Sequence, residues 1–377
     1  MNSTQVLSIR IKGALLLAFA LLAGCAAAPP KAPLETEAVF YPLPPDPPRI
    51  QYLATFANAR DLGAQESELA KFIAGDDKAG EELKRPYGVA MREGKIYVAD
   101  NRLSGLAEFD LKTKQFSLMS GTGAGRMQRP INVTIDADGT KYVTDTGRDQ
   151  VLVYDRNDRF VSAFGEKGEF KPVDTAILGE RLYVVDIEHH EVWVLDKHDG
   201  KVLFKFGKAG SGEGELYHPT NLAIGPDKDI YIVETSNFRV SRFTAEGKFI
   251  SSFGQAGQGP GQFARPKGIA IDHAGRIYVG DAAFQNVQIF DSSGHVFMAF
   301  GQPREGAPGA LNLPAGIAID YADVGLFQRY ADPKFALEYV ILVVSQFGPN
   351  KVDVFGFGKM SGIDYPPDEK PDPKPAR

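Results

Sequence analysis

Three oxygen-bearing side chains recur at one position of a sequence repeat, where they could bind a cation or a polar ligand. Six prolines, spaced 44, 42, 47, 47 and 48 residues apart, each begin a run of small and apolar residues: Pro86, Pro130, Pro172, Pro219, Pro266 and Pro314. Two residues past three of them stand Asn132, Asp174 and Asn221, where the other repeats have glycine. Carboxylate and amide oxygens are ligands that Ca²⁺ prefers. The spacing predicts that the three side chains converge, either on a calcium ion or ligand group, or on ordered water.

Other segments that resemble chemical motifs fit turns better. The Gly-rich stretches 121–125, 210–214 and 257–261 lead into a proline-started strand instead of a helix, so they lack the helix N-terminus that binds phosphate. The Asp136–Gly139 segment resembles a calcium loop, but Gly147 stands where an EF-hand loop needs Glu. No Ser-His-Asp arrangement is readable, and the three loop histidines, His189, His190 and His218, lie away from the axial positions, which argues against a histidine metal site.

The elements that position these residues are short strands. Each repeat contains a small-residue strand, a Tyr-Val-rich strand ending in an acid, a third apolar strand and a Phe-Gly segment before a Gly-rich loop. Runs such as 151–154 and 341–344 are apolar at every position, which is typical of sheets covered on both faces. A repeat of this length made of four strands predicts the blade of a β-propeller.

One repeat carries a family resemblance in full. It reads Arg265-Pro266-x-Gly268-Ile269-Ala270-Ile271-Asp272, Ile277-Tyr278-Val279-x-Asp281, Val287-x-Ile289-Phe290-Asp291 and Phe300-Gly301, and it resembles the NHL repeat. The resemblance covers residues 49–358 and implies an all-β, six-bladed propeller. The last repeat lacks a fourth strand, and residues 49–56 resemble the fourth strand at 248–253. We therefore expect the N-terminal strand to complete the last blade and close the ring.

Two sets of charged residues recur on one face of the predicted propeller. Basic residues precede five of the prolines, with Leu313 in the sixth repeat: Arg85, Arg129, Lys171, His218 and Arg265. Acids end five of the second strands, with Ser345 in the sixth: Asp100, Asp145, Asp186, Glu234 and Asp281. A feature of nearly every repeat serves the repeat, so we expect these residues to pair with one another or to cap turns between blades.

The sixth repeat departs from the pattern through an insertion at 321–338. It carries aromatic residues that are candidate partner contacts, namely Phe327, Tyr330 and Phe335, and a short helix is expected over 323–330. Insertions in repeat proteins often make specific contacts. Alternatively, and equally in keeping with the sequence, the insertion packs over the floor of the channel.

The first 24 residues are predicted to be a signal peptide, with Arg10 and Lys12 before an apolar run too short to span a bilayer. The run ends in Leu22-Ala23-Gly24-Cys25, which resembles the bacterial lipobox and makes Cys25, the single cysteine, the expected lipidation site. Ala26 in place of Asp resembles Gram-negative lipoproteins sorted to the outer membrane. A Pro-rich tether at 25–48 and a disordered tail at 359–377 are expected around the propeller at 49–358.

The net charge of −6 becomes −8 once the signal peptide is removed, which argues against a strong nucleic-acid binder. Our hypothesis is a membrane-anchored, extracytoplasmic binding or scaffold propeller that holds a protein partner in the cell envelope, since propellers of this family commonly mediate assembly. The alternative is a propeller enzyme of the lactonase or lyase type with a metal site at the channel mouth. It rests on a resemblance in outline to the central site of calcium-dependent propeller lactonases, at Asn132, Asp174 and Asn221, with Ca²⁺ as the candidate cofactor.

Overall fold

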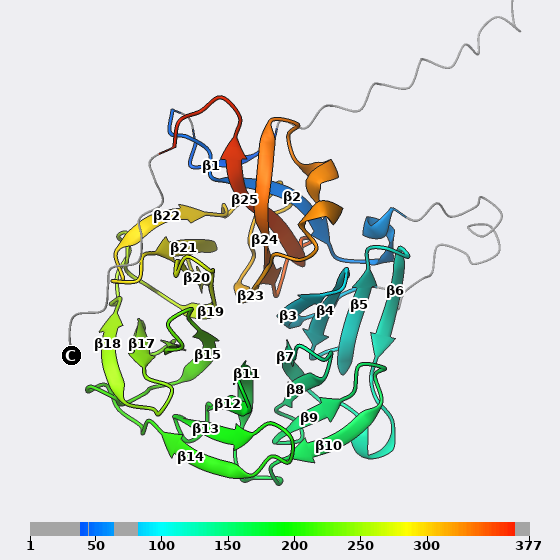
Figure 1. Cartoon of the computed structure of the whole chain (residues 1–377), viewed down its shortest axis with the longest axis vertical. Coiled ribbons are helices and arrows are strands. Elements are labelled where there is room, and N and C mark those ends of the chain that lie inside the picture. The colour runs from blue at the N-terminus through cyan, green and yellow to red at the C-terminus, as the bar shows by residue number, and fades with distance from the viewer. Residues whose placement is uncertain (1–37, 44, 64–81, 366–377) are drawn as a thin grey trace, which may run out of the picture. The chain divides into compact units, whose positions relative to one another are not determined.

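In this computed structural model, residues 38–43, 45–63 and 82–365 are described, and they form six antiparallel sheets arranged around one axis (Figure 1). The predicted signal peptide, Cys25 and the first part of the predicted tether lie outside the described residues. Within the described ranges, none of the helices has both the length and the apolar character needed to cross a membrane.

Four strands make up each of the first five blades. Blade 1 consists of β3 (Pro86–Arg92), β4 (Lys95–Asp100), β5 (Gly105–Asp110) and β6 (Gln115–Met119). Blade 2 consists of β7 (Pro130–Ile135), β8 (Lys141–Asp145), β9 (Gln150–Tyr154) and β10 (Phe160–Phe164). Blade 3 consists of β11 (Pro172–Leu178), β12 (Arg181–Asp186), β13 (Glu191–Asp196) and β14 (Val202–Phe206). Blades 4 and 5 consist of β15 (Pro219–Ile224), β16 (Ile230–Glu234), β17 (Arg239–Phe243) and β18 (Phe249–Phe253); and β19 (Pro266–Ile271), β20 (Ile277–Asp281), β21 (Asn286–Phe290) and β22 (Val296–Phe300). Short 3₁₀ turns, η1 (Ala59–Leu62) and η2 (Gly123–Gly125), lie between strands. Every predicted proline begins the first, innermost strand of a blade.

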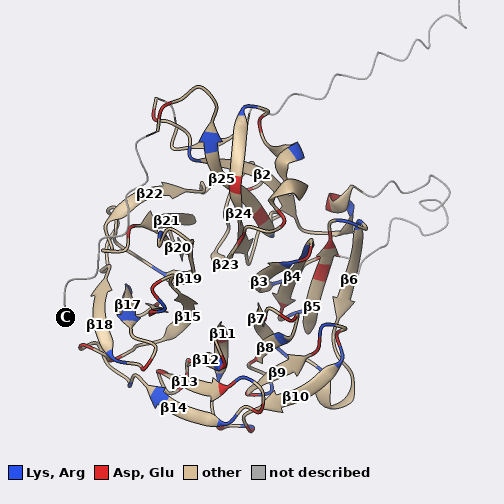
Figure 2. Ribbon diagram, viewed as in Figure 1, with Lys and Arg blue, Asp and Glu red and all other residues tan. Residues whose placement is uncertain are grey.

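The blades pack face to face, as the apolar strands predict. All five residues of β8, β16 and β20 are buried, whereas the outermost strand β18 is exposed along most of its length. Small residues are required near the axis: a Cβ on Gly268 would lie 1.8 Å from the Ala315 carbonyl oxygen of the next blade. Charged residues stand mainly in the turns, and the strands carry few of them (Figure 2).

The sixth blade closes the ring with both ends of the described chain. Its sheet has the order β1-β2-β25-β24-β23, made of β1 (Phe40–Tyr41), β2 (Ile50–Phe56), β25 (Val352–Met360), β24 (Phe335–Ser345) and β23 (Pro314–Asp320). β2 pairs antiparallel with β25 from Ile50 opposite Phe357 to Phe56 opposite Val352. The predicted closure by the N-terminal strand is confirmed.

The sheet also extends further than the sequence predicted at both ends. β1 lies in the segment assigned to the tether and pairs with β2, because Phe40 packs edge-on against Phe335 and Tyr41 is buried near Phe355. At the other end, the Tyr365 hydroxyl donates a hydrogen bond to the Pro48 carbonyl at 2.8 Å. The folded domain therefore begins before residue 49, and the first residues of the predicted tail contact it.

The insertion packs at the junction of blades 6 and 1. It forms two 3₁₀ turns, η3 (Val324–Leu326) and η4 (Gln328–Tyr330), instead of the expected helix. Phe327 is fully buried in a core cluster that contains Phe56 of blade 6 and Phe109 of blade 1. The Asp323 carboxylate accepts the Gly94 N–H of blade 1 at 2.7 Å. The insertion is thus a second device that holds the ring closed.

Of the three aromatic residues predicted as candidate partner contacts, two are fully buried. Phe327 lies in the interblade core, and Phe335 packs on Phe40. Tyr330 is half-buried against the same core. Their large apolar areas stabilise the junction of the blades, so in this structure Phe327 and Phe335 offer no surface to a partner.

Candidate functional site

The two faces of the propeller differ in how their charges are used. We call the face where the six prolines start the first strands the proline face, and the one where hairpins join first to second strands the hairpin face. On the proline face, the acid ending each second strand of blades 1 to 5 is fully buried. The Asp100 carboxylate accepts backbone N–H groups of Lys84 and Arg85 at 2.7 and 2.8 Å and of Arg102 and Leu103 at 2.9 and 3.1 Å. The predicted capping of turns is confirmed.

Because these acids bond to backbone amides, several basic side chains beside them are left without a counter-charge. Within the described part of the chain, the exposed Arg85, Arg129 and Arg265 have no carboxylate at ion-pair distance. Lys171 lies 3.7 Å from Glu188, and the His218 Nδ1 lies 2.9 Å from the Ser236 hydroxyl. Within the described chain, no side chain of the basic set forms an ion pair with a member of the acidic set, so the predicted pairing of the two sets is not seen.

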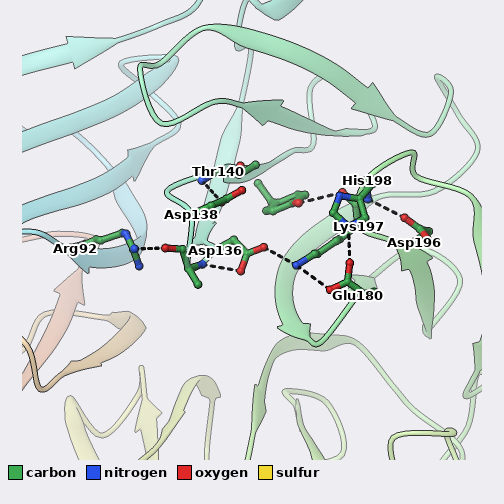
Figure 3. A network of polar contacts seen from close by, with 10 residues as sticks. Arg92, Asp136, Asp138, Thr140, Glu180, Asp196, Lys197 and His198 are labelled. Atoms are coloured by element: carbon green, nitrogen blue, oxygen red, sulfur yellow. Dashed lines mark hydrogen bonds and ion pairs between the residues drawn. The ribbon is translucent and has the colours of Figure 1, made fainter.

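On the hairpin face, by contrast, ion pairs join neighbouring blades. Figure 3 shows Lys197 between two carboxylates, with its Nζ 2.9 Å from Asp136 of blade 2 and 3.5 Å from Glu180. In blade 4, Arg242 bonds to Asp229 at 2.7 Å and to Asp227 at 2.5 Å. Cations on this face are thus largely used to hold the fold together.

The structure brings together the three predicted polar residues near the axis, on β7, β11 and β15. One Asp174 oxygen accepts the Asn132 side-chain amide at 2.5 Å and the Thr175 N–H at 2.8 Å. The other accepts the Asn221 amide at 3.0 Å and the Leu222 N–H at 2.9 Å. Burial raises the pKa of Asp174 to about 7, although these four donors favour the charged form. The trio links the first strands of blades 2, 3 and 4.

This arrangement does not present the oxygens that calcium needs. Both Asp174 oxygens already accept two hydrogen bonds each, and the Asn132 Oδ1 accepts the Val133 N–H at 2.9 Å. Of the trio's side-chain oxygens, only the Asn221 Oδ1 is buried without a partner. Calcium binds about six to eight oxygens. With their amides oriented in this way, the three side chains fit a structural role, in which they join blades 2, 3 and 4, and do not fit a resident calcium site.

Among the described residues, one group of three side chains has metal-ligand spacing: Asp186, His189 and Glu191, whose ligand atoms lie within 4.8 Å of one another. The His189 Nδ1 lies 2.7 Å from Asp186, and this hydrogen bond raises the pKa of His189. The Glu191 carboxylate accepts the Trp193 indole N–H at 2.8 Å. These contacts fit an ion pair at a turn.

Sequence reasoning missed the residues one step past the prolines, which are Tyr87, Ile131, Val173, Thr220, Lys267 and Ala315. Lys267 is the charged member of the set and is only 6% exposed. Its Nζ lies 4.9 Å from the centre of the Tyr87 ring and 3.2 Å from the Gln346 Oε1. The signal was present, because a lone lysine interrupts a position otherwise held by uncharged residues.

The comparisons with known proteins agree with this fold. A family model described as a 6-bladed beta-propeller matches residues 226–302. None of the curated proteins compared with the chain matches it significantly.

Solved structures give the same architecture. Virginiamycin B lyase from Staphylococcus aureus is 14% identical, with 72% of this chain and 80% of that chain covered and a TM-score of 0.50. A gluconolactonase from Xanthomonas campestris is 14% identical, with 85% and 97% covered and a TM-score of 0.55. A Bacteroides thetaiotaomicron protein of unknown function is 16% identical, with 82% and 75% covered and a TM-score of 0.55. Identities this low show the fold alone, and by that fold the chain is a six-bladed β-propeller.

Proposed function

We propose that the protein is a lipid-anchored, extracytoplasmic binding propeller of the NHL type that holds an acidic region of a partner protein on its proline face. The observation that carries the proposal is the set of unpaired cations there. Arg85, Arg129 and Arg265 keep their guanidinium groups exposed, while the neighbouring acids bond to backbone amides. In a chain of net charge −6, a local cluster of positive charge favours an acidic partner through charge complementarity.

Exposed aromatic residues on the same face support a protein partner. Phe347 is 48% exposed and lies under the Arg85 guanidinium, 5.5 Å from the ring centre. Tyr217 is 43% exposed and packs beside His218. Aromatic residues and arginine dominate the binding energy of protein interfaces. Together they give the proline face both the charge and the apolar area that a partner needs.

The anchor is proposed from the sequence. Lipidation at Cys25 would tie the propeller to the cell envelope, with the outer membrane of a Gram-negative bacterium as the proposed location. Since the described fold begins near residue 38, residues 25–37 set the reach of the anchor, which is at most about 45 Å. The propeller therefore acts close to the membrane.

The experiment compares two triple variants of the lipidated full chain in its native envelope, with captured proteins identified after crosslinking. Reversal of Arg85, Arg129 and Arg265 to Glu should abolish capture of the partner, and wild-type capture should weaken with salt. The matched control reverses three exposed cations of the hairpin face: Arg156, Lys201 and Lys248. The control makes the same change in net charge and should leave capture intact. Equal capture by both variants would overturn the proposal.

An enzyme of the lactonase or lyase type is the second candidate. Burial raises the pKa of Asp174 to about 7, and strongly shifted pKa values are common at catalytic sites. Replacing Asn132, Asp174 and Asn221 together distinguishes the two functions. Loss of a measured turnover with intact partner capture would favour the enzyme.

A further inference from the structure

A buried lysine on the proline face has two arginines near it, Arg265 and Arg85. The Nζ of Lys267 on β19 of blade 5 lies 4.9 Å from the centre of the Tyr87 ring on β3 of blade 1. Its Nζ donates to the Gln346 side-chain carbonyl, and no carboxylate of the described chain lies at ion-pair distance. Other buried cations differ: Lys141 has Asp158 at 2.8 Å. Burial without a counter-charge is costly for an ammonium group, so this position favours an incoming anion.

The charges that act on Lys267 itself are positive. Burial, followed by the nearby Arg265 and Arg85, lowers the pKa of Lys267 to about 8. Burial, followed by the negative charge of Asp174, raises the pKa of Tyr87 to about 12, so its hydroxyl remains a donor at neutral pH. An anion reaching Lys267 would therefore meet an amine and a phenol, with two guanidinium groups nearby.

Blade 6 places no further charge at the positions beside Lys267. It has Leu313 where five blades have a basic residue, and its first strand opens with the small residues Ala315 and Gly316. Gln346 follows the end of its second strand, is almost fully buried and holds the Lys267 amine. Blade 6 thus supplies a neutral, small-residue wall between the cations of blades 5 and 1.

We propose that Lys267, Tyr87, Arg85 and Arg265 bind one carboxylate, the side chain of an aspartate or glutamate at the centre of the partner's acidic region. This inference rests on the proposed function, whose partner it describes. A planar guanidinium group matches a carboxylate with two parallel hydrogen bonds, and the amine adds a third donor. Phe347, which stacks on Arg85, holds one guanidinium near the site.

The test uses glutarate as the probe with the purified full chain, by calorimetry at constant ionic strength. Glutarate should bind saturably. Near pH 8 about half of the Lys267 amines are neutral, so binding should take up roughly half a proton per site, and almost none at pH 6. The uptake is measured by repeating the titration in buffers of different ionisation enthalpy.

Three variants decide the outcome. Lys267→Met should abolish binding and proton uptake, and Arg265→Gln should weaken binding about tenfold. Arg156→Gln is the matched control, since Arg156 is an exposed arginine of the hairpin face, and it should change nothing. Thermal melts check that each variant is folded. Unchanged glutarate binding by Lys267→Met, or tighter binding of inorganic phosphate than of glutarate, would overturn the carboxylate site.

The two proposals fail separately. Partner capture that survives Lys267→Met, with glutarate binding lost, rejects the carboxylate anchor and keeps the binding face. Glutarate binding by a wild-type protein whose capture is unaffected by the triple reversal rejects the binding face and keeps the anion site.

Discussion

Replacing Asp353 by Asn should stabilise the propeller at neutral and alkaline pH. Asp353 lies on β25, opposite Thr55 of the closing strand β2, and is fully buried. Neither carboxylate oxygen has a hydrogen-bond partner, because the nearby Thr55 hydroxyl donates to the Val352 carbonyl and the Asn350 amide donates to Ala307 and Ala310. Burial therefore raises the pKa of Asp353 well above its usual value.

The magnitude follows from proton linkage. The folded protein keeps the Asp353 proton at pH values where the unfolded chain, with a pKa near 3.9, has released it. The free energy of unfolding then falls by about 1.4 kcal/mol for each pH unit between that value and the folded pKa. The amide that replaces the carboxyl group does not titrate, so the variant should be almost no more stable than the wild type at pH 4 and increasingly more stable as the pH rises toward the folded pKa of Asp353.

The assay is denaturant unfolding of Asp353→Asn and wild type from pH 4 to pH 8. Asp145→Asn is the matched control: Asp145 is equally buried, but its carboxylate accepts the N–H groups of Gln128, Arg129 and Gly147. An amide there would direct a donor at donors, so this control should lose about 1–3 kcal/mol at neutral pH. A difference between Asp353→Asn and wild type that stays constant across the pH range would refute the reasoning.

Three further outcomes test the closure and the axial trio. Deleting residues 49–57 should prevent stable folding, because β25 would keep only β24 as a partner and its other edge would be unpaired. A truncated protein that melts like the parent would contradict the closure. Phe327→Ala should cost about 3–5 kcal/mol in the same unfolding assay and leave partner capture unchanged, since the ring is fully buried between blades. Asp174→Ala should lower the free energy of unfolding by about 3 kcal/mol or more, because it leaves the Asn132 and Asn221 amides without a partner. Millimolar calcium should not raise the Tm of the wild type. A calcium-dependent rise in Tm that is lost in Asp174→Ala would support the metal site instead.

The architecture was predictable because packing between blades imposes residue size at each distance from the axis. The proline at the start of each first strand and the apolar second strands recur with every blade, and a glycine stands two residues past the proline in three of them. The closure was readable because β2 resembles the other fourth strands. β1 was not, since a Pro-rich segment favours extended backbone and does not reveal that Phe40 and Tyr41 will find aromatic neighbours.

The site was predictable only in part. The periodic spacing placed Asn132, Asp174 and Asn221 together, but amide orientation decides whether they face an ion or one another, and no sequence pattern records it. The aromatic residues of the insertion were open to two readings for a similar reason. Burial of Phe327 depends on how the insertion packs across two blades.

The structural roles of the repeated residues determine which other residues are free to bind a ligand. Five acids of the proline face are held by backbone amides, so each is committed to the turn it caps, and its replacement would damage the fold before it altered binding. Blade 6 escapes this demand, since Ser345 accepts only the Asn312 N–H there and Gln346 is left to bond with Lys267. The blade that departs most from the repeat, because it must also close the ring, is therefore the one beside which an unpaired buried cation can be tolerated.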